Sequence, residues 1–224
     1  IPLFVSRLTD SSLAVGAVTA AFQLGWLPQV FVAGYVERSQ RKWPWVIWLT
    51  PFERGSALLL AVCALLAPSL GVAVLPIVFF ACFSQTLFGG LALTPWLDVI
   101  ARVVPGRLRG RFMGTSNMLG AVLGAGTAAL VAPLLDWYEF PYNFAACFGL
   151  AGVIFAIGMI PIFLVKEPPG PPPRPPHPLR VQLAELPRVL TGDPAFRRFV
   201  LGLCCSAFGT MSSGFLVVYG VREL

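Results

Sequence analysis

The lysines and arginines of this chain fall in alternate gaps between long apolar segments, and this pattern restricts the fold more than any other feature. Most of the 16 basic residues lie in three gaps: Arg38, Arg41 and Lys42; Arg102, Arg107, Arg109 and Arg111; and Lys166, Arg174, Arg180, Arg188, Arg197 and Arg198. The gaps near Asp10, Pro68 and Asp136 hold only Arg7. Short cytoplasmic loops of membrane proteins keep their basic residues, whereas translocated loops lose them. The pattern therefore predicts a multi-span membrane protein whose three basic gaps face the cytoplasm.

Composition agrees with a chain that has lipid as its solvent. Hydrophobic residues make up 57% of the sequence and charged residues 12%, about half the charged share of a soluble domain. In lipid, each backbone polar group must find its partner inside the protein, which favours helices. The net charge of +6 is then explained by loops facing anionic lipid headgroups, so we expect the bilayer and not nucleic acid as the partner.

Six segments are long and apolar enough to cross a membrane, which takes about 20 residues. They are 13–36, 44–67, 71–97, 112–135, 143–165 and 199–221, and residues 1–8 have the character of the end of an earlier span. No clean alternation of apolar and polar residues supports strands. The sequence therefore predicts an all-α integral membrane bundle with one partial and six complete spans.

The third basic gap, 166–198, divides the chain into parts. Its first half is rich in proline, which favours an extended polyproline spacer. Residues 179–190 then carry apolar side chains at helical spacing, which predicts an amphipathic helix on the inner membrane face. We expect an N-terminal unit at 1–165, a cytoplasmic loop at 166–198, and a further helix in 199–224.

Two basic gaps contain acids that need partners. In the first, Glu37 precedes Arg38, Arg41 and Lys42, which fits either a set of charges that locks helix ends or an ordinary basic loop. In the second, Asp98 comes near the end of a span, where an acid requires a basic partner such as Arg41 or Arg38.

These stretches together resemble the major facilitator superfamily. Residues 33–42 are similar to its G-x-L-A-D-R-x-G-R-K motif between helices two and three, with Glu37 in place of Asp and with Ala33 and Gln40 in place of glycines. The stretch from Asp98 to Gly110 resembles the loop between helices four and five. The proline-rich gap resembles the long central loop, and 193–199 resembles the beginning of helix seven.

The resemblance implies a major-facilitator-like bundle that holds the six-helix N-terminal half, with helix one truncated, plus helix seven. It implies a secondary active transporter of a small solute that works by alternating access between two halves. It also implies a conformational latch that stabilises the outward-open state, formed by Glu37, Arg38, Arg41, Lys42, Asp98 and Arg109.

The chain also departs from the drug–proton antiporters of that family. Residues 79–96, where these antiporters often carry an arginine, have no charge, and Gln85 is the most polar long side chain there. The segment 112–135 lacks their Gly-Pro signature. We expect its glycines at 114, 120, 124 and 126 to serve close helix packing.

Charges inside a span identify candidate path residues. Glu53 and Arg54 follow Pro51, and adjacent helical residues point about 100° apart, so each needs a partner on another helix or a cavity. They are either a structural pin or a coupling or substrate site. Gln23, Trp26 and Gln29 share one side of 13–36 and would suit a polar lining, as would Gln85.

Other function classes find less support in the sequence. The five cysteines lie in apolar segments without metal-ligand spacing, and His177 lies in the proline-rich loop, so we expect no metal, cofactor or catalytic residue. A membrane enzyme would need clustered catalytic side chains. A non-transporting receptor or scaffold of the same fold is the other alternative.

We expect the chain to be a fragment in a bacterial inner membrane. It opens on Ile1 with only a partial first span, so the partners would be an unknown small solute and the missing C-terminal half of the same protein.

The latch hypothesis predicts that Glu37→Gln or Asp98→Asn in the full-length parent slows transport, because each change removes a charge that holds one conformation. Membrane insertion should change little, which quantification of protein in isolated membranes would show. Unchanged transport in both variants would remove the latch.

Overall fold

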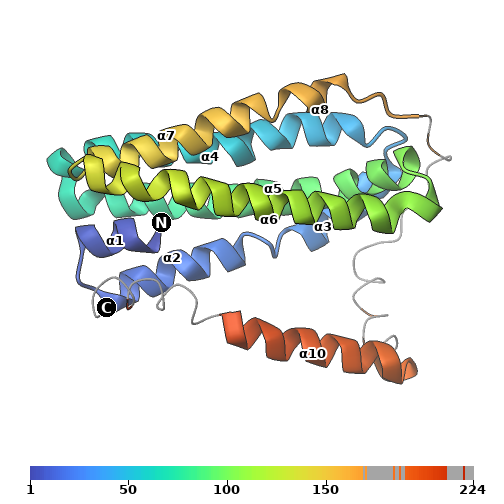
Figure 1. The fold of residues 1–224 in the computed structure, drawn as a ribbon. Coiled ribbons are helices and arrows are strands. Elements are labelled where there is room, and N and C mark those ends of the chain that lie inside the picture. The colour runs from blue at the N-terminus through green and yellow to red at the C-terminus, as the bar shows by residue number, and fades with distance from the viewer. Residues whose placement is uncertain (169, 171–183, 185–186, 188–189, 211–218, 220–224) are drawn as a thin grey trace.

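The computed structural model of the chain describes residues 1–168, 170, 184, 187, 190–210 and 219, and all regular structure in these residues is helical. The elements, in chain order, are α1 (Pro2–Leu8), α2 (Ser12–Leu24), α3 (Gln29–Arg38), α4 (Trp43–Leu70), the 3₁₀ turn η1 (Gly71–Val74), α5 (Leu75–Val103), α6 (Gly106–Trp137), α7 (Tyr142–Ile157), α8 (Ile160–Leu164) and α10 (Pro194–Thr210) (Figure 1). The prediction of an all-α bundle is confirmed.

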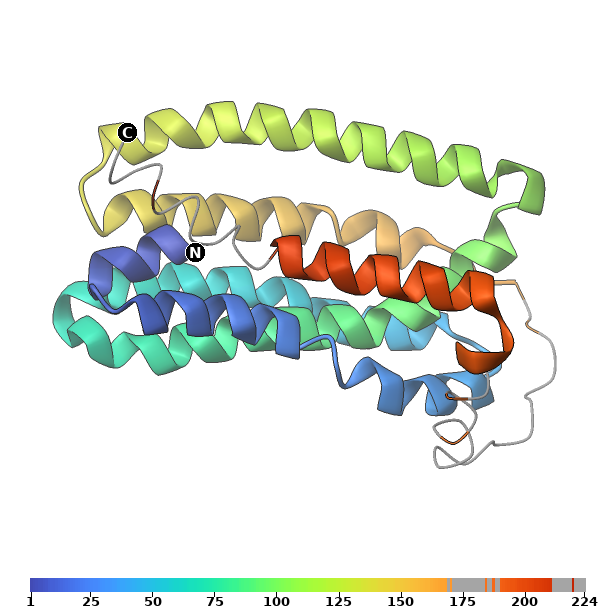
Figure 2. The same cartoon turned by 90° about the horizontal axis from the view of Figure 1, so that it is seen from below.

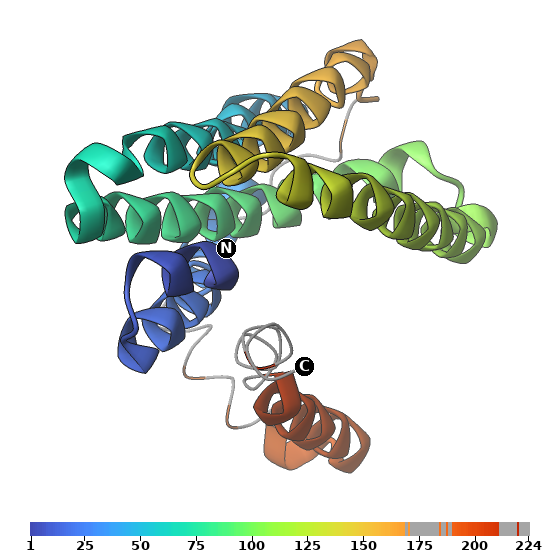
Figure 3. The same cartoon turned by 60° about the vertical axis from the view of Figure 1, so that its left-hand side comes forward.

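A hairpin of two long helices forms the centre of the bundle. α4 and α5 have 28 and 29 residues and pack on each other more extensively than any other pair. The chain reverses between them at Gly71, whose φ of 54° lies in the left-handed region that glycine enters without strain. α7 packs on α4 and α2 packs on α5, so the hairpin is covered on two sides (Figure 3).

The helices are long enough to cross a bilayer. Within the part of the chain that the structure describes, four helical stretches have the required length and apolar character: Ser12–Val36, Trp43–Val103, Gly106–Trp137 and Tyr142–Leu164. The second contains 61 residues and consists of α4, η1 and α5, and each of its long helices alone exceeds the ~20 residues that a crossing needs. The chain is therefore a multi-pass integral membrane protein.

Two predicted spans are interrupted in the structure. The segment 13–36 breaks after α2, where Trp26 and Leu27 donate to carbonyls three residues back and Pro28 precedes α3. The segment 143–165 breaks at Gly158 and Met159, between α7 and α8. The sequence predicted continuous helices because the residues before and after each break are equally apolar. Apolar content therefore gives no sign of the break.

The chain reversal also lies later than predicted. α4 continues through Pro68 to Leu70, so the gap between the predicted spans 44–67 and 71–97 is helical and the turn is made by Gly71 and η1.

The structure describes only part of the region for which the sequence predicted a proline-rich loop and a last span. α10 spans Pro194–Thr210, begins before the predicted span 199–221, and has almost all of its side chains exposed up to Ala207. It lies apart from the main bundle in Figures 1 and 3, and in front of the bundle in the view from below (Figure 2). The proline-rich run and the predicted amphipathic helix at 179–190 fall almost entirely outside the described residues.

Two apolar clusters hold the bundle together at different heights. The larger one joins α1, α2, η1, α7 and the facing halves of α4 and α5, around Phe4, Val18, Leu60 and Val78. The smaller one joins the other ends of α4 and α5 to α8 through Trp43, Val46, Val99 and Ile162. Between these clusters lies the part of α4 that carries Glu53 and Arg54.

α6 differs from its neighbours because none of its residues is buried. A Cβ added at any of its glycines at 114, 120, 124 and 126 would meet nothing within 4 Å among the described residues. The prediction that these glycines pack closely against another helix is therefore wrong for this part of the chain. The helix lies at the margin of the bundle (Figure 3). Among the described residues it packs mainly against α7 and only slightly against α5, and neither contact involves these glycines.

Close contact between α2 and α5 requires glycine at position 25. An added Cβ would lie 2.0 Å from Thr86 Oγ1 and 2.8 Å from both the Leu87 nitrogen and the Phe83 oxygen. We predict that Gly25→Ala destabilises the protein by about 1–3 kcal/mol, because backbone on α5 must move. Thermal unfolding in detergent measures this.

Gly55→Ala is the matched control, since a Cβ there meets nothing within 4 Å and alanine is the better helix former. Equal melting temperatures for the two variants would contradict the close approach of α2 to α5.

Candidate functional site

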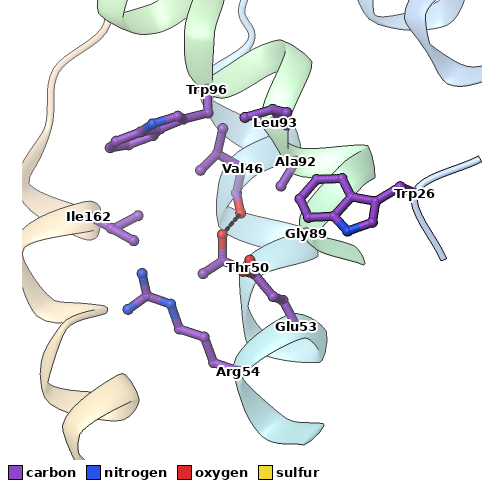
Figure 4. Close-up of a pocket in the computed structure, with 10 residues that line it drawn as sticks. All are labelled: Trp26, Val46, Thr50, Glu53, Arg54, Gly89, Ala92, Leu93, Trp96 and Ile162. Carbon is purple, nitrogen blue, oxygen red and sulfur yellow. Dashed lines mark hydrogen bonds between the residues drawn. The ribbon is translucent and has the colours of Figure 1, made fainter. Parts of the chain in front are cut away.

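A cavity of about 320 Å³ lies between the two apolar clusters. Four elements contribute its walls: the α2–α3 break gives Trp26; α4 gives Val46, Thr50, Glu53 and Arg54; α5 gives Gly89, Ala92, Leu93 and Trp96; and α8 gives Ile162 (Figure 4). The residues from α4 and from α5 recur at spacings of three and four, so each set occupies one helix face.

Each wall of the pocket comes from an interrupted or proline-containing helix. α2 and α3 are separate, α7 and α8 are separate, and α4 and α5 contain Pro51 and Pro95 close to the pocket. A proline inside a helix cannot donate to the carbonyl four residues earlier, which affects Ile47 and Leu91. Interrupted helices near mid-membrane are typical of solute sites in transporters.

Arg54 donates a hydrogen bond to a backbone carbonyl near the end of α7, where the helix breaks. Its Nη1 donates to the Phe155 oxygen at 3.0 Å, and its guanidinium carbon lies 5.9 Å from the centre of the Phe155 ring. The neighbouring carbonyls, Ile154 and Ala156, already accept from Gly158 and Met159. The positive charge also faces the negative end of the α7 dipole. Arg54 therefore links α4 to the end of α7.

Glu53 is placed differently. Its carboxylate lies beside α5, where a Cβ added at Gly89 would be only 3.3 Å from Oε1. In Figure 4 it extends toward Thr50, with the Arg54 guanidinium on one side of it and the Trp26 ring on the other. No described residue donates a hydrogen bond to it or forms an ion pair with it. Ten residues of helix separate it from Trp43, or about 15 Å, which is about half of a 30 Å hydrocarbon core.

The predicted path residues are only partly brought together. Trp26, Glu53 and Arg54 line one pocket. Gln29 comes near the same level, with its Cβ 3.7 Å from a Cβ added at Gly90 of α5. Gln23 and Gln85 do not line the cavity. The break after α2 interrupts the regular spacing that placed Gln23 on the same side as Trp26.

A second feature, which we call the helix-end cluster, comprises Gln40, Lys42, Trp43, Arg102 and Glu167. One oxygen of the Glu167 carboxylate accepts from both backbone nitrogens of residues 42 and 43, each at 2.8 Å, and the other accepts from Arg102 Nη1 at 2.5 Å. Arg102 Nη1 also donates to the Gln40 oxygen at 2.9 Å. A carboxylate here complements the unpaired N–H groups and positive dipole at the beginning of α4.

This cluster joins the beginning of α4, the end of α5 and the segment after α8. The Glu167 side chain is 3% exposed and that of Arg102 is 17% exposed. An ion pair so well shielded is screened far less by salt than a surface pair. The end of the first basic gap and the beginnings of the second and third thus meet at one end of the bundle.

The predicted latch residues surround this cluster. Arg38 lies over the Tyr35 ring at 5.4 Å, and Arg109 donates to the Val104 and Ala101 oxygens at the end of α5. Lys42 Nζ donates to the Val36 oxygen, and Arg41 is exposed. The side chain of Glu37 lies outside the described residues.

Asp98 is half-buried and pairs with neither Arg38 nor Arg41 among the described side chains. Arg102, one helical turn further along α5, reaches the first loop instead.

Sequence reasoning did not single out Arg102 and Glu167. Glu167 is the first acid in a gap that is otherwise strongly basic, and it follows a predicted span directly. That isolated acid was the available signal. Its partners are two backbone N–H groups and an arginine more than 60 residues away, and no sequence pattern encodes such a contact.

The groups in the pocket are suited to binding. They are one carboxylate, one guanidinium, one hydroxyl and two indole rings, and the Thr50 hydroxyl already donates to the Val46 oxygen at 2.7 Å. Among the described residues, no three His, Cys, Asp or Glu side chains gather in a way that could hold a metal ion.

Long apolar helices, interrupted beside a cavity that holds charged side chains, are typical of the class of multi-pass membrane transport proteins. The family model described as Major Facilitator Superfamily matches residues 1–223, so the chain belongs to this superfamily and is a membrane transporter of the major facilitator type. Members of the family are transporters and not enzymes. Comparison with curated proteins and with solved structures found no match.

The helix-end cluster predicts a local effect of Glu167→Gln. The amide cannot offer two anionic oxygens to residues 42 and 43 and to Arg102, so the beginning of α4 should open more often. Hydrogen exchange measured on a peptide covering residues 40–45 should accelerate at least about tenfold.

Lys166→Gln is the control, because it changes the adjacent exposed charge without touching α4. Equal exchange in the two variants would contradict a capping role for Glu167.

Proposed function

We propose that the chain supplies one half of a secondary active transporter that moves a small solute by alternating access. Residues 1–165 form the N-terminal half, 166–198 the central loop, and 199–224 the first helix of the second half. The partner that completes the path is the C-terminal half of the same fold. The observation that carries this proposal is the cavity around Glu53, which lies at mid-membrane depth between interrupted helices.

The pocket suits a solute that binds and then leaves. A charged side chain at that depth is costly unless a partner, a cavity or a bound ion offsets it. Arg54 has a partner in the Phe155 carbonyl, whereas Glu53 faces the cavity. A solute or ion that enters the pocket would provide the missing interaction, and departure of this ligand toward either side completes transport.

The charged end of the bundle supports a two-state movement. The helix-end cluster ties α4, α5 and the end of α8 into one body, so these ends would move together when the halves rock. Asp98, Arg38, Arg41 and Arg109 lie around that body, where they would form and break contacts with the second half. In this scheme Glu37 and Lys42 belong to the same latch.

We place the basic end of the bundle in the cytoplasm and the membrane as a bacterial inner membrane. Arg102 and the first loop meet at this end. The opposite end carries the acids Asp136 and Glu139 beside Arg7. This asymmetry follows the rule that retained loops are basic.

The decisive experiment is solute flux. The full protein that carries this chain would be reconstituted into proteoliposomes with an imposed proton or sodium gradient and a mixture of small metabolites. We expect at least one solute to accumulate above protein-free vesicles, in a manner that collapses with the gradient, measured by mass spectrometry of the vesicle contents.

Glu139→Gln, at the opposite end from the basic gaps, should keep the flux. If no solute accumulates with any gradient although the protein is folded and inserted, active transport is excluded and a binding role replaces it.

A further inference from the structure

We infer that the pocket around Glu53 binds an organic cation, a substituted or quaternary ammonium group attached to a small apolar body. This inference rests on the proposed function, because it names the solute class for the same cavity. It follows from the balance of charges in the pocket, from its aromatic walls and from its size.

The charge balance of the pocket favours a positive ligand. Arg54 lines the cavity, but its Nη1 is bonded to the Phe155 oxygen and its guanidinium lies on the Phe155 ring, at the negative end of α7. Glu53 has no hydrogen-bond donor or ion-pair partner among the described residues. The charge at this depth that lacks a direct hydrogen-bond or ion-pair partner among the described residues is therefore negative.

The two side chains extend toward different neighbours. The Glu53 carboxylate lies beside Thr50 and Gly89, between the Arg54 guanidinium and the Trp26 ring, whereas Arg54 points toward Ile162 of α8 (Figure 4). A cation that sits on the Trp26 side of the pocket would thus meet the carboxylate before the guanidinium. Gly89 permits this position, since a Cβ there would come within 3.3 Å of Oε1.

Two indole rings provide the second attraction. Trp26 and Trp96 line the pocket from separate elements, and Trp26 packs against Gly90, where an added Cβ would lie 3.2 Å from the ring. Tryptophan is the strongest aromatic partner for a cation above its ring face. Val46, Leu93 and Ile162 supply an apolar surface for the rest of the ligand.

The helix backbone adds partial negative charge. Pro51 and Pro95 leave the carbonyls of Ile47 and Leu91 without their intrahelical donors, close to the residues that line the pocket. A free carbonyl attracts a cation and repels an anion. The cavity of about 320 Å³ falls at the lower end of the range for small-molecule sites, about 300–1,000 Å³.

Radiolabelled benzyltrimethylammonium is the probe that tests this inference. Equilibrium dialysis of the full protein in lipid nanodiscs, with protein-free nanodiscs subtracted, measures its binding. We expect saturable binding that unlabelled probe displaces. Neopentylbenzene, the uncharged carbon isostere, should displace it poorly, as should phenylacetate, an anion of similar size.

Variants connect the binding to the pocket. Glu53→Gln keeps the size of the side chain and should weaken binding at least about tenfold. Trp26→Leu removes one ring and should weaken it about threefold. Glu139→Gln removes an acid at the opposite end of the bundle and should leave binding unchanged. Trp26 is 38% exposed, so its variant tests the site even if Glu53→Gln misfolds.

Three results would overturn the inference. Equal displacement by neopentylbenzene would make the pocket merely apolar. Stronger displacement by phenylalanine betaine, which adds a carboxylate to the cation, would assign a zwitterion that also uses Arg54. Absence of saturable binding, or binding that is unchanged in both pocket variants, would remove the cation site.

The outcome is separable from that of the transport proposal. Flux of some other solute without binding of the probe would overturn the cation site and leave transport intact. Saturable binding that depends on Glu53, without flux of any solute, would sustain the cation site and overturn transport.

Discussion

The structure depends on one constraint: within lipid, every backbone N–H and C=O must find its partner inside the protein. Unbroken helices meet this constraint by themselves, but the helices around the pocket are broken at two places and contain prolines at two others. Charged side chains provide hydrogen-bond partners for some of the backbone groups that these interruptions leave unpaired. Arg54 bonds the Phe155 carbonyl at the end of α7, and Arg109 bonds the Ala101 and Val104 carbonyls at the end of α5.

Glu167 provides a partner for backbone N–H groups, since its carboxylate accepts from the first backbone nitrogens of α4. It also accepts a hydrogen bond from Arg102. The ionic contacts of this chain are thus largely contacts with helix ends, and they fix the relative positions of α4, α5, α7 and α8. Glu53 is the exception, because its carboxylate faces the cavity and not a helix end. A carboxylate that no described residue bonds, beside a cavity, is the reason for assigning ligand binding to this position.

Much of the fold could be predicted from the sequence. The segments 44–67, 71–97 and 112–135 correspond to α4, α5 and α6, because apolar length is a sufficient signal for a helix in lipid. The breaks at Gly25–Pro28 and at Gly158 were missed. At the first, Gly25 approaches Thr86 of α5 closely, and at the second the end of α7 provides the carbonyl that Arg54 bonds, so both breaks lie at contacts with neighbouring helices. For the same reason the glycines of α6 were assigned a packing role that the described neighbours do not provide.

By itself the sequence determined the class of the protein, the approximate spans and the presence of charge at membrane depth in Glu53 and Arg54. These follow from composition and spacing, which the bilayer constrains directly. Only the tertiary structure decided what each charge does. Glu53 and Arg54 are adjacent in sequence, yet a helix turns them toward different neighbours, so one binds a carbonyl on α7 and the other faces a cavity. In the same way Glu167 is tied to Arg102 and to the beginning of α4 by the meeting of three helix ends, which is a property of packing and not of local sequence.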